Sequence, residues 1–401
     1  MTVTIPEVRD AAPRKLCTDC GVSRMADPSA CGTACQFIKP DYPALEKQVH
    51  GRAAADGVEA FFGVNLVMHR AAMRRPAEGA QWTGITTALA ADLLTRGKVD
   101  AVLCMVPDTA DRWAPRPAII TQASDMAQAR GMRMGYAPLL ALLEPAVAAG
   151  HRRIALIGIP CQVYALRALE AKLGLDRLYV IGTPCSDNTT TENFHGFLAR
   201  LTDTPDDVTY LEFRADYRVE LRFKDGRKRF IPFLKLPLSD LPRDFFPLTC
   251  RTCVDYTNRL ADITVGYMAG EGDQWLIVRN ARGAEMLDGL GDQLHLSAPG
   301  SAGNRTNAVK GFIENTRLAA GGLPLRRMPN WLRPLMAWLQ PRIGPRGTEF
   351  AKARLEMKAA ETVLHLRREE PAKIKNMVPA HVWALTKRYG LAPTPDETND
   401  G

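Results

Sequence analysis

The sequence lacks several features that would assign the protein to a class at once. No run of about 20 apolar residues occurs, so no membrane span is predicted; the richest stretch, 136–150, carries Glu144 and two prolines. No charged-then-apolar signal segment opens the chain, so we expect a cytoplasmic protein, at most peripheral to a membrane, whose thiols stay reduced. No Gly-x-Gly-x-x-Gly follows a predicted strand, which leaves a Rossmann-type nucleotide site unsupported.

The chain also lacks internal repeats and any recognised nucleic-acid-binding motif, so no nucleic-acid partner is expected. Its 401 residues, 46% apolar and 24% charged, are ordinary for a globular protein of one large domain or two. The net charge is +8, and residues 321–401 contribute fourteen Lys and Arg against eight Asp and Glu. This basic tail suits an acidic electron carrier or an anionic lipid surface, and a solvated helical face explains it equally well.

Cysteine is the residue type that the sequence uses most distinctively. Eight of the nine cysteines fall into two sets of four, and Cys104 is left over. The first set is Cys17, Cys20, Cys31 and Cys35, and the second is Cys161, Cys185, Cys250 and Cys253. A cubane iron–sulfur cluster takes four thiolates, so the two sets predict two [4Fe-4S] clusters and one-electron chemistry.

Structural zinc is the main alternative, because zinc is also held by Cys-x-x-Cys pairs. The spacing of the N-terminal set fits either metal. The second set fits zinc less well, because its ligands come from positions about ninety residues apart, whereas structural zinc usually draws them from one compact knuckle. Iron–sulfur is therefore the favoured interpretation, and a zinc-stabilised binding protein without turnover remains open.

The middle of the chain predicts an α/β passage. Residues 153–158 and 178–182 have the composition of buried strands, and 162–173 has helical spacing of its apolar residues. Such a unit makes two parallel strands, whose carboxyl ends share one sheet edge. Because Pro160-Cys161 and Pro184-Cys185 follow these strands, we expect both thiols at that edge, where open α/β sheets bind ligands.

Other segments complete a mixed α/β (α+β) fold: a central, partly parallel sheet with flanking helices, a Cys-rich N-terminal segment and a helical C-terminal tail. A helix is predicted at 85–96, and a buried strand at 99–106 places Cys104 in packing. An antiparallel hairpin with an Asp-Gly turn is predicted within 210–233, and Cys250–Cys253 is expected in the loop that follows. Strands are predicted at 263–267 and 275–278. Towards the C-terminus we expect an apolar stripe of Trp331, Leu335 and Trp338 before Pro341, and a long helix at 351–370. The predicted parts are a Cys-rich iron–sulfur segment at 1–75, a flavin-binding part at 76–150, a core with the second cluster at 151–322, and a basic helical tail at 323–401.

A flavin would join the clusters to organic chemistry, because it accepts electrons singly and delivers them in pairs. The best candidate site is GAQWTGITT, where glycines, threonine hydroxyls and a helix start can hold a phosphate. By itself this pattern is more often a simple helix cap. The candidate residues are Gly79, Gln81, Trp82, Thr83, Gly84, Thr86 and Thr87.

Several stretches together resemble one family. They are WTGITTALAADLL, IGIPCQVYALRALE, TPCSDN, CRTCVDYTNRLADITVGYM, VRNARG, MPNWL and IGPRGTEFAKARLEM. They resemble the β-subunit family of coenzyme F-420 hydrogenases and dehydrogenases. Within it they are most similar to the branch of ferredoxin-dependent 3,8-divinyl (proto)chlorophyllide 8-vinyl reductases and plant 7-hydroxymethyl chlorophyll a reductases.

The resemblance implies bound FAD, two [4Fe-4S] clusters, reduced ferredoxin as donor and a chlorophyllide-type tetrapyrrole as substrate. It favours an 8-vinyl reductase of (bacterio)chlorophyll synthesis, in the cytoplasm or peripheral to the photosynthetic membrane, with homo-oligomers allowed. The enzymatic alternatives are reduction of another pigment substituent, such as a 7-hydroxymethyl group, and electron transfer to deazaflavin as part of a hydrogenase or dehydrogenase. Asp187, His195 and Tyr136 are candidate proton donors, and Arg116 and Arg133 candidate propionate ligands, although each is more often structural.

Two departures from that branch matter. Its N-terminal pattern is Cys-x-x-Cys-x-x-Cys, whereas Ser23 occupies the third position here, and Cys31 is the expected substitute. The segment after Gly266-Tyr267-Met268 is also short, reaching Trp275 within seven residues, where a longer loop is expected. If that loop lines the pigment pocket, the choice of substrate is open.

Overall fold

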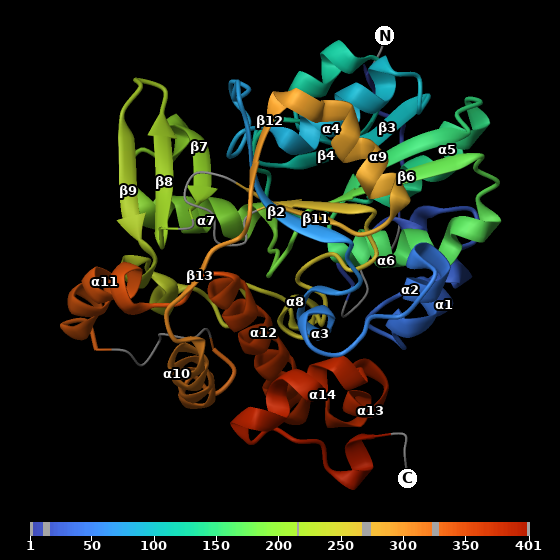
Figure 1. The fold of residues 1–401 in the computed structure, drawn as a ribbon. Coiled ribbons are helices and arrows are strands. Elements are labelled where there is room, and N and C mark those ends of the chain that lie inside the picture. Colours follow the sequence, from blue (N-terminus) through green and yellow to red (C-terminus); the bar gives the residue numbers. More distant parts are fainter. Residues whose placement is uncertain (1–2, 11–16, 215, 267–273, 323–328, 399–401) are drawn as a thin grey trace. The chain divides into compact units, whose positions relative to one another are not determined.

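The computed structural model describes residues 3–10, 17–214, 216–266, 274–322 and 329–398 (Figure 1). Within these ranges the chain forms two compact units. The first unit comprises Met1–Cys185, Asp255–Gly266 and Gln274–Ala298, and the second comprises Ser186–Val254 and Pro299–Gly401.

The first unit holds a nine-stranded sheet and its helices. Its elements are β1 (Val3–Thr4), α1 (Cys31–Ala34), α2 (Tyr42–His50), α3 (Val58–Phe62), β2 (Val67–Met73), α4 (Ile85–Thr95), β3 (Ala101–Pro107), β4 (Pro115–Ile120), α5 (Leu143–Ala148), β5 (Arg153–Gly158), α6 (Pro160–Leu169), β6 (Arg177–Gly182), β10 (Ile263–Gly266), β11 (Gln274–Val278), α9 (Ala281–Leu290) and β12 (Leu294–Ser297).

The strand order is β1-β4-β3-β5-β6-β10-β11-β2-β12. The central neighbours β3, β5, β6 and β10 run parallel, and the flanking pairs run antiparallel. The predicted mixed α/β class with a partly parallel sheet is therefore confirmed. So is the strand–helix–strand unit, which the structure forms as β5, α6 and β6.

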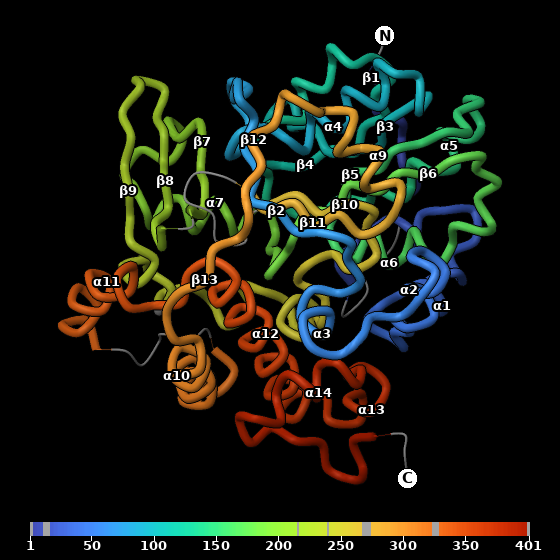
Figure 2. Tube along the Cα trace, in the orientation of Figure 1, coloured from blue at the N-terminus to red at the C-terminus, as the bar shows by residue number. Residues whose placement is uncertain are grey.

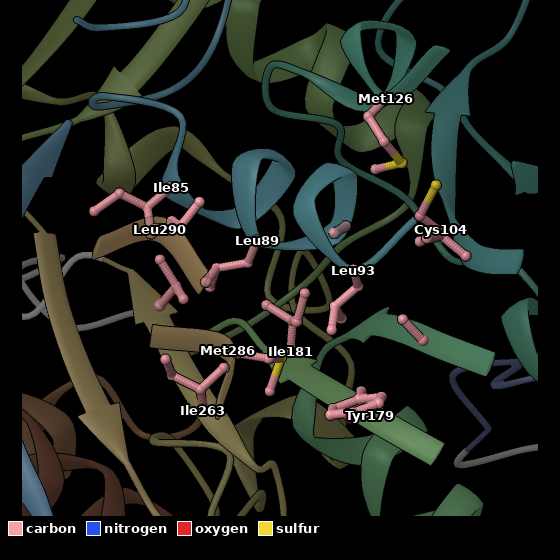
Figure 3. Close-up of a cluster of buried hydrophobic side chains, with 14 of the residues drawn as sticks. Ile85, Leu89, Leu93, Cys104, Met126, Tyr179, Ile181, Ile263, Met286 and Leu290 are labelled. Atoms are coloured by element: carbon pink, nitrogen blue, oxygen red, sulfur yellow. The ribbon is translucent and has the colours of Figure 1, made fainter. Parts of the chain in front are cut away.

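Successive side chains along the strands of the sheet pack on its two opposite faces. On β6, Tyr179 and Ile181 join the core under α4 and α9, where Leu89 and Met286 also pack (Figure 3). The intervening Leu178 and Val180 are buried too and point to the opposite face, because successive strand residues alternate. The helix α6 of the β5–β6 crossover covers that second face. Burial on both sides explains why these strands are continuous apolar runs.

Cys104 belongs to this core. It lies on β3, is 1% exposed, and packs in the same cluster as Leu93 and Met126 (Figure 3). Burial raises the pKa of its thiol to about 12, so it stays protonated at neutral pH. The prediction that Cys104 lies inside a buried strand is confirmed.

The second unit combines a small antiparallel sheet with helices (Figure 2). Its elements are α7 (Thr191–Leu201), β7 (Val208–Phe213), β8 (Arg218–Phe223), β9 (Lys228–Pro232), α8 (Leu248–Arg251), β13 (Ser301–Ala302), α10 (Arg305–Leu318), α11 (Leu332–Ile343), β14 (Arg346–Gly347), α12 (Thr348–Glu369), α13 (Ile374–Met377) and α14 (Ala380–Thr386). The hairpin with an Asp-Gly turn is confirmed, since β8 pairs with β9 across Gly226 at φ 83°.

One local expectation was wrong. Cys250 lies in the short helix α8 rather than in a loop, because Pro247 supplies a pre-set start and Thr252 closes the turn onto the Leu248 carbonyl. The predicted Trp331/Leu335/Trp338 stripe lies on the helix α11, which continues through Pro341 to Ile343. Among the described residues, no helix is long and apolar enough to cross a membrane.

Candidate functional site

The four N-terminal cysteines gather in the first unit. Cys17 and Cys20 precede a 3-10 turn at Val22–Arg24, Cys31 begins α1, and Cys35 ends it. Burial, together with the negative charge of the other three thiolates, raises the pKa of Cys20 to about 12. Burial and neighbouring thiolates also raise the pKa of Cys35. Crowding four ionisable thiols is costly without a cation, and bound metal relieves that repulsion.

Backbone N–H groups point at these sulfurs. The Asp19 N–H donates to Cys17 Sγ at 3.3 Å, the Val22 N–H bonds Cys20, and the N–H groups of Phe37 and Ile38 bond Cys35. Such donors suit thiolates that carry charge, and hydrogen bonds to sulfur are among the levers that set a cluster's potential. The N-terminal segment therefore fits an iron–sulfur cluster in both composition and backbone donors.

The turn between Cys20 and Val22 depends on a glycine. Gly21 has φ 109°, and a Cβ there would lie 2.5 Å from the Ala141 nitrogen. The charge of a Cys31 thiolate contributes to the raised pKa of Cys20 and of Cys35, and the role of Cys31 as a substitute for a ligand at Ser23 stays a prediction. Across the described residues, no three His, Cys, Asp or Glu side chains converge on a position for a single metal ion.

Cys161 and Cys185 lie beyond the ends of adjacent parallel strands. The register pairs Gly158 with Gly182, and each cysteine follows its glycine by three residues. The predicted shared sheet edge is therefore present. Buried Asn258 fixes it, because its side-chain amide donates to the carbonyl oxygens of Gly158 at 2.8 Å and Thr183 at 3.3 Å.

The N-terminal segment reaches this edge. The Thr18 hydroxyl donates to Cys161 Sγ at 3.7 Å, and α1 packs against α6. Thr18 lies between the first two cysteines of the N-terminal set, so the same short loop serves both groups of thiols. Sequence reasoning missed Thr18, since a threonine inside Cys-x-x-Cys has no distinguishing pattern.

Cys250 and Cys253 lie in the second unit, at the end of α8, and both are buried. The long helix α12 holds this turn in place, because the Thr362 hydroxyl donates to the Cys253 carbonyl at 3.1 Å. Whether these two cysteines share a cluster with Cys161 and Cys185 stays a prediction.

Asp187, which is half-buried, forms an ion pair with buried Lys358 in the second unit. Lys358 Nζ lies 2.7 Å from Asp187 Oδ1 and 3.1 Å from Glu361 Oε2, so one ammonium serves two carboxylates. Burial raises the pKa of Asp187 to about 6. Burial alone would also raise that of Glu361, but Lys358 and His365 bring its pKa down to about 2. Lys358 and Glu361 were missed, because they lie about 170 residues from Asp187 in the sequence.

The other candidate proton donors are not part of this ion pair. His195 is exposed on α7 of the second unit, and Tyr136 is half-buried in the first unit. The proposed propionate ligands have structural partners. Arg133 donates to four backbone carbonyls, at residues 128–131, and Arg116 pairs with Asp108 at 3.4 Å.

The flavin candidate segment forms the entry to α4. Gly84 is the N-cap residue at φ 91°, and Trp82 adopts φ 51°, which is unusual for a non-glycine residue. Two of the threonine hydroxyls serve the protein itself. Thr87 donates to the Gly84 carbonyl at 3.1 Å, and Thr83 Oγ1 accepts from the Met73 N–H and from Gln274.

Unpaired polar atoms cluster around this segment. Within the part of the chain that the structure describes, Trp82 Nε1 in the segment and Oε1 of Gln274, whose amide donates to Thr83, are buried without hydrogen-bond partners, and no side chain caps the start of α4. Buried polar atoms are rarely left unpaired, so these point to a polar ligand. The segment fits a flavin in that respect, and Gln274 adds a position that the sequence pattern did not identify.

The fold and the site thus define an α/β protein. Its first unit carries a segment with four cysteines, two cysteines beyond the ends of parallel strands, and a helix start with unpaired polar atoms that a ligand could satisfy. The family model for the N-terminal part of the coenzyme F420 hydrogenase/dehydrogenase beta subunit matches residues 68–144, and the one for its C-terminal part matches residues 151–300. The chain belongs to this coenzyme F420 hydrogenase/dehydrogenase beta-subunit family.

Two relatives match almost the whole chain. An uncharacterised protein of Nostoc sp. (strain PCC 7120) is 35% identical over 94% of both chains. The 7-hydroxymethyl chlorophyll a reductase, chloroplastic, of Oryza sativa subsp. japonica is 34% identical over 93% of this chain and 82% of its own length. A chain of the F420-reducing [NiFe] hydrogenase complex from Methanosarcina barkeri shares the fold, with a TM-score of 0.56, 18% identity, and coverage of 76% of this chain and 93% of that one.

Proposed function

We propose that this protein is an oxidoreductase that reduces a side group of a chlorophyllide-type tetrapyrrole with electrons from reduced ferredoxin. The observation that carries the proposal is the similarity, over 93% of the chain, to a relative named as a chlorophyll a reductase. Two [4Fe-4S] clusters and FAD would supply one-electron transfer and its conversion to a two-electron reduction.

The N-terminal cluster is assigned to Cys17, Cys20, Cys31 and Cys35, and backbone N–H groups donate to the sulfurs of Cys17, Cys20 and Cys35. The second cluster is assigned to Cys161, Cys185, Cys250 and Cys253. Chain connectivity supports that set, because the Cys185 N–H donates to the carbonyl of Tyr256, only three residues after Cys253.

FAD is assigned to the entry of α4, with Trp82, Gly84 and Gln274 as contacts. Asp187 is the proposed source of the proton, held in place by Lys358. The net charge of +8 suits an acidic carrier such as ferredoxin as the electron donor.

The proposed substituent is the 8-vinyl group of 3,8-divinyl chlorophyllide or protochlorophyllide. Its reduction consumes two electrons and two protons and adds both hydrogens across the carbon–carbon double bond. A 7-hydroxymethyl group is the second candidate, and the name of the Oryza relative favours it. That reaction consumes the same electrons and protons but releases water and leaves a methyl group.

Product mass distinguishes these reactions. Anaerobic protein is incubated with reduced ferredoxin and each pigment in turn, and the product is analysed by chromatography and mass spectrometry. Gain of two hydrogens from the divinyl pigment supports the first assignment, and loss of oxygen from the hydroxymethyl pigment supports the second. Turnover of neither pigment, with rapid reduction of deazaflavin instead, would overturn the pigment proposal.

A further inference from the structure

The helix α11 exposes an apolar stripe. Trp331, at its N-cap, is 76% exposed, Leu335 50% and Trp338 57%, and the spacing of four and then three residues places them on one face. Ile343, at the end of the helix, is 62% exposed. Exposed tryptophan is costly in water, and the other described tryptophans are buried or half-buried. Large apolar patches of this kind mark interaction surfaces.

The helix that carries the stripe packs against its own unit. The helix α11 packs on the 3-10 turn Phe233–Lys235 of the same unit. The exposed face also carries Arg342, whose guanidinium lies 4.3 Å from the centre of the Trp338 ring. A cation therefore accompanies the aromatic residues on the side that faces solvent.

The charge around the stripe is of one sign. Residues 315–348 contain six arginines and no Asp or Glu, so this stretch of the sequence favours an anionic partner. A short helix with Trp and Leu on one face and arginines beside them is typical of a segment that lies in a membrane interface. Tryptophan prefers the headgroup level of a bilayer, and juxtaposed arginines are attracted to anionic lipids.

We propose that α11 docks the protein on the surface of an anionic lipid bilayer, with Trp331, Leu335 and Trp338 inserted among the headgroups. An acidic protein would satisfy the arginines, but it would not by itself explain two tryptophans and a leucine in one exposed stripe. This inference goes beyond the proposed reaction and does not depend on it, because binding is measured without turnover.

Vesicle flotation of the anaerobically purified full chain tests the proposal. The vesicles are phosphatidylcholine alone, or phosphatidylcholine with phosphatidylglycerol. We expect binding to the anionic vesicles that exceeds binding to neutral ones by about tenfold at low salt and weakens as salt rises. The triple variant Trp331→Ser, Leu335→Ser, Trp338→Ser should lose about tenfold or more of that binding.

Two matched controls test whether vesicle binding depends on where the apolar and charged residues lie or only on their number. Leu66→Ser removes an apolar residue that is 63% exposed in the first unit, and it should bind vesicles like wild type. Arg342→Glu should weaken binding, whereas Arg227→Glu at the tip of the β8–β9 hairpin makes the same charge change and should not. Because Arg342 is exposed, Arg342→Glu keeps the test valid even if the triple variant fails to fold.

Three results would overturn the proposal. They are failure of the wild type to float with anionic vesicles, equal flotation of the wild type and the Arg342→Glu variant, and a triple variant that keeps vesicle binding but loses reduction by ferredoxin. The last would assign the stripe to a protein partner. If the wild type is a dimer, the triple variant is a monomer and neither protein binds vesicles, the stripe would be assigned to self-association.

Discussion

The two sets of cysteines are built in different ways. The N-terminal set comes from one stretch of nineteen residues, and local turns, a glycine at φ 109° and backbone N–H groups arrange its sulfurs. In the second set, Cys161 and Cys185 owe their proximity to the parallel pairing of β5 and β6 and to the Asn258 clamp. The N-terminal cysteines are thus arranged by sequence spacing, whereas the position of Cys161 and Cys185 at one sheet edge is set by topology.

Substitution of Cys161 or Cys185 is expected to have the largest effect among the tests of that contrast. Cys161→Ser and Cys185→Ser should each lower the iron content from about eight to about four per chain and remove the same cluster signal from the EPR spectrum. Activity with ferredoxin should fall to background, because electrons no longer reach the flavin. If the two variants damage different clusters, the shared-edge assignment is wrong.

The N-terminal set is tested by a pair of variants. Cys20→Ser should also lower the iron content to about four per chain, but it should spare the signal that Cys161→Ser removes. Cys104→Ala is the matched control, because that thiol lies in the apolar core and should leave all of the iron in place. Loss of a cluster in Cys104→Ala, with an unchanged circular dichroism spectrum, would mean that the ligand sets are wrong.

Sequence reasoning succeeded where the information is local or periodic. Strand β5 and the β8–β9 hairpin follow from apolar runs and an Asp-Gly turn. It failed where tertiary contacts decide. Cys250 lies in the helix α8 rather than in a loop, and Lys358 pairs with Asp187 across a distance in sequence that no spacing rule covers. The short segment after Gly266 includes residues 267–273, which lie outside the described residues.

The pH dependence of stability tests the packing of α2, the helix that follows the N-terminal cysteines in the first unit. His50 ends α2, and its ring nitrogens contact the Arg259 carbonyl at 2.9 Å and the Asn280 side-chain amide at 3.3 Å, an arrangement that suits neutral histidine. Burial, followed by the charges of Arg279 and Arg167, lowers its pKa to about 4. Between pH 6.5 and 4 the unfolded state therefore binds more protons, and stability falls as pH falls.

We expect the wild type to lose about 2 kcal/mol of unfolding free energy between about pH 7 and pH 5 through this residue. His50→Gln should be less stable at neutral pH and lack that component of the pH dependence. Urea unfolding of both proteins, followed by circular dichroism across this range, measures the difference. Parallel pH profiles would contradict the assignment of His50 as a buried neutral residue.

The smallest expected effect concerns Thr18. Thr18→Val removes the hydroxyl that donates to Cys161 Sγ and should lower the midpoint potential of one cluster only. For a one-electron couple, a tenfold change in the reduction equilibrium corresponds to about 59 mV, and we expect a shift no larger than that. Thr18→Ser keeps the donor and should restore the wild-type value in an EPR-monitored redox titration. Equal potentials in all three proteins would show that the hydroxyl does not tune the cluster.

The central claim is that two structurally different sets of cysteines hold two clusters, and it is tested most directly by the metal content of anaerobically purified protein. The account predicts about eight iron atoms and eight acid-labile sulfides per chain, with bound FAD and little zinc. Stoichiometric zinc without sulfide would contradict it, because the cysteines would then be structural ligands with no electrons to carry.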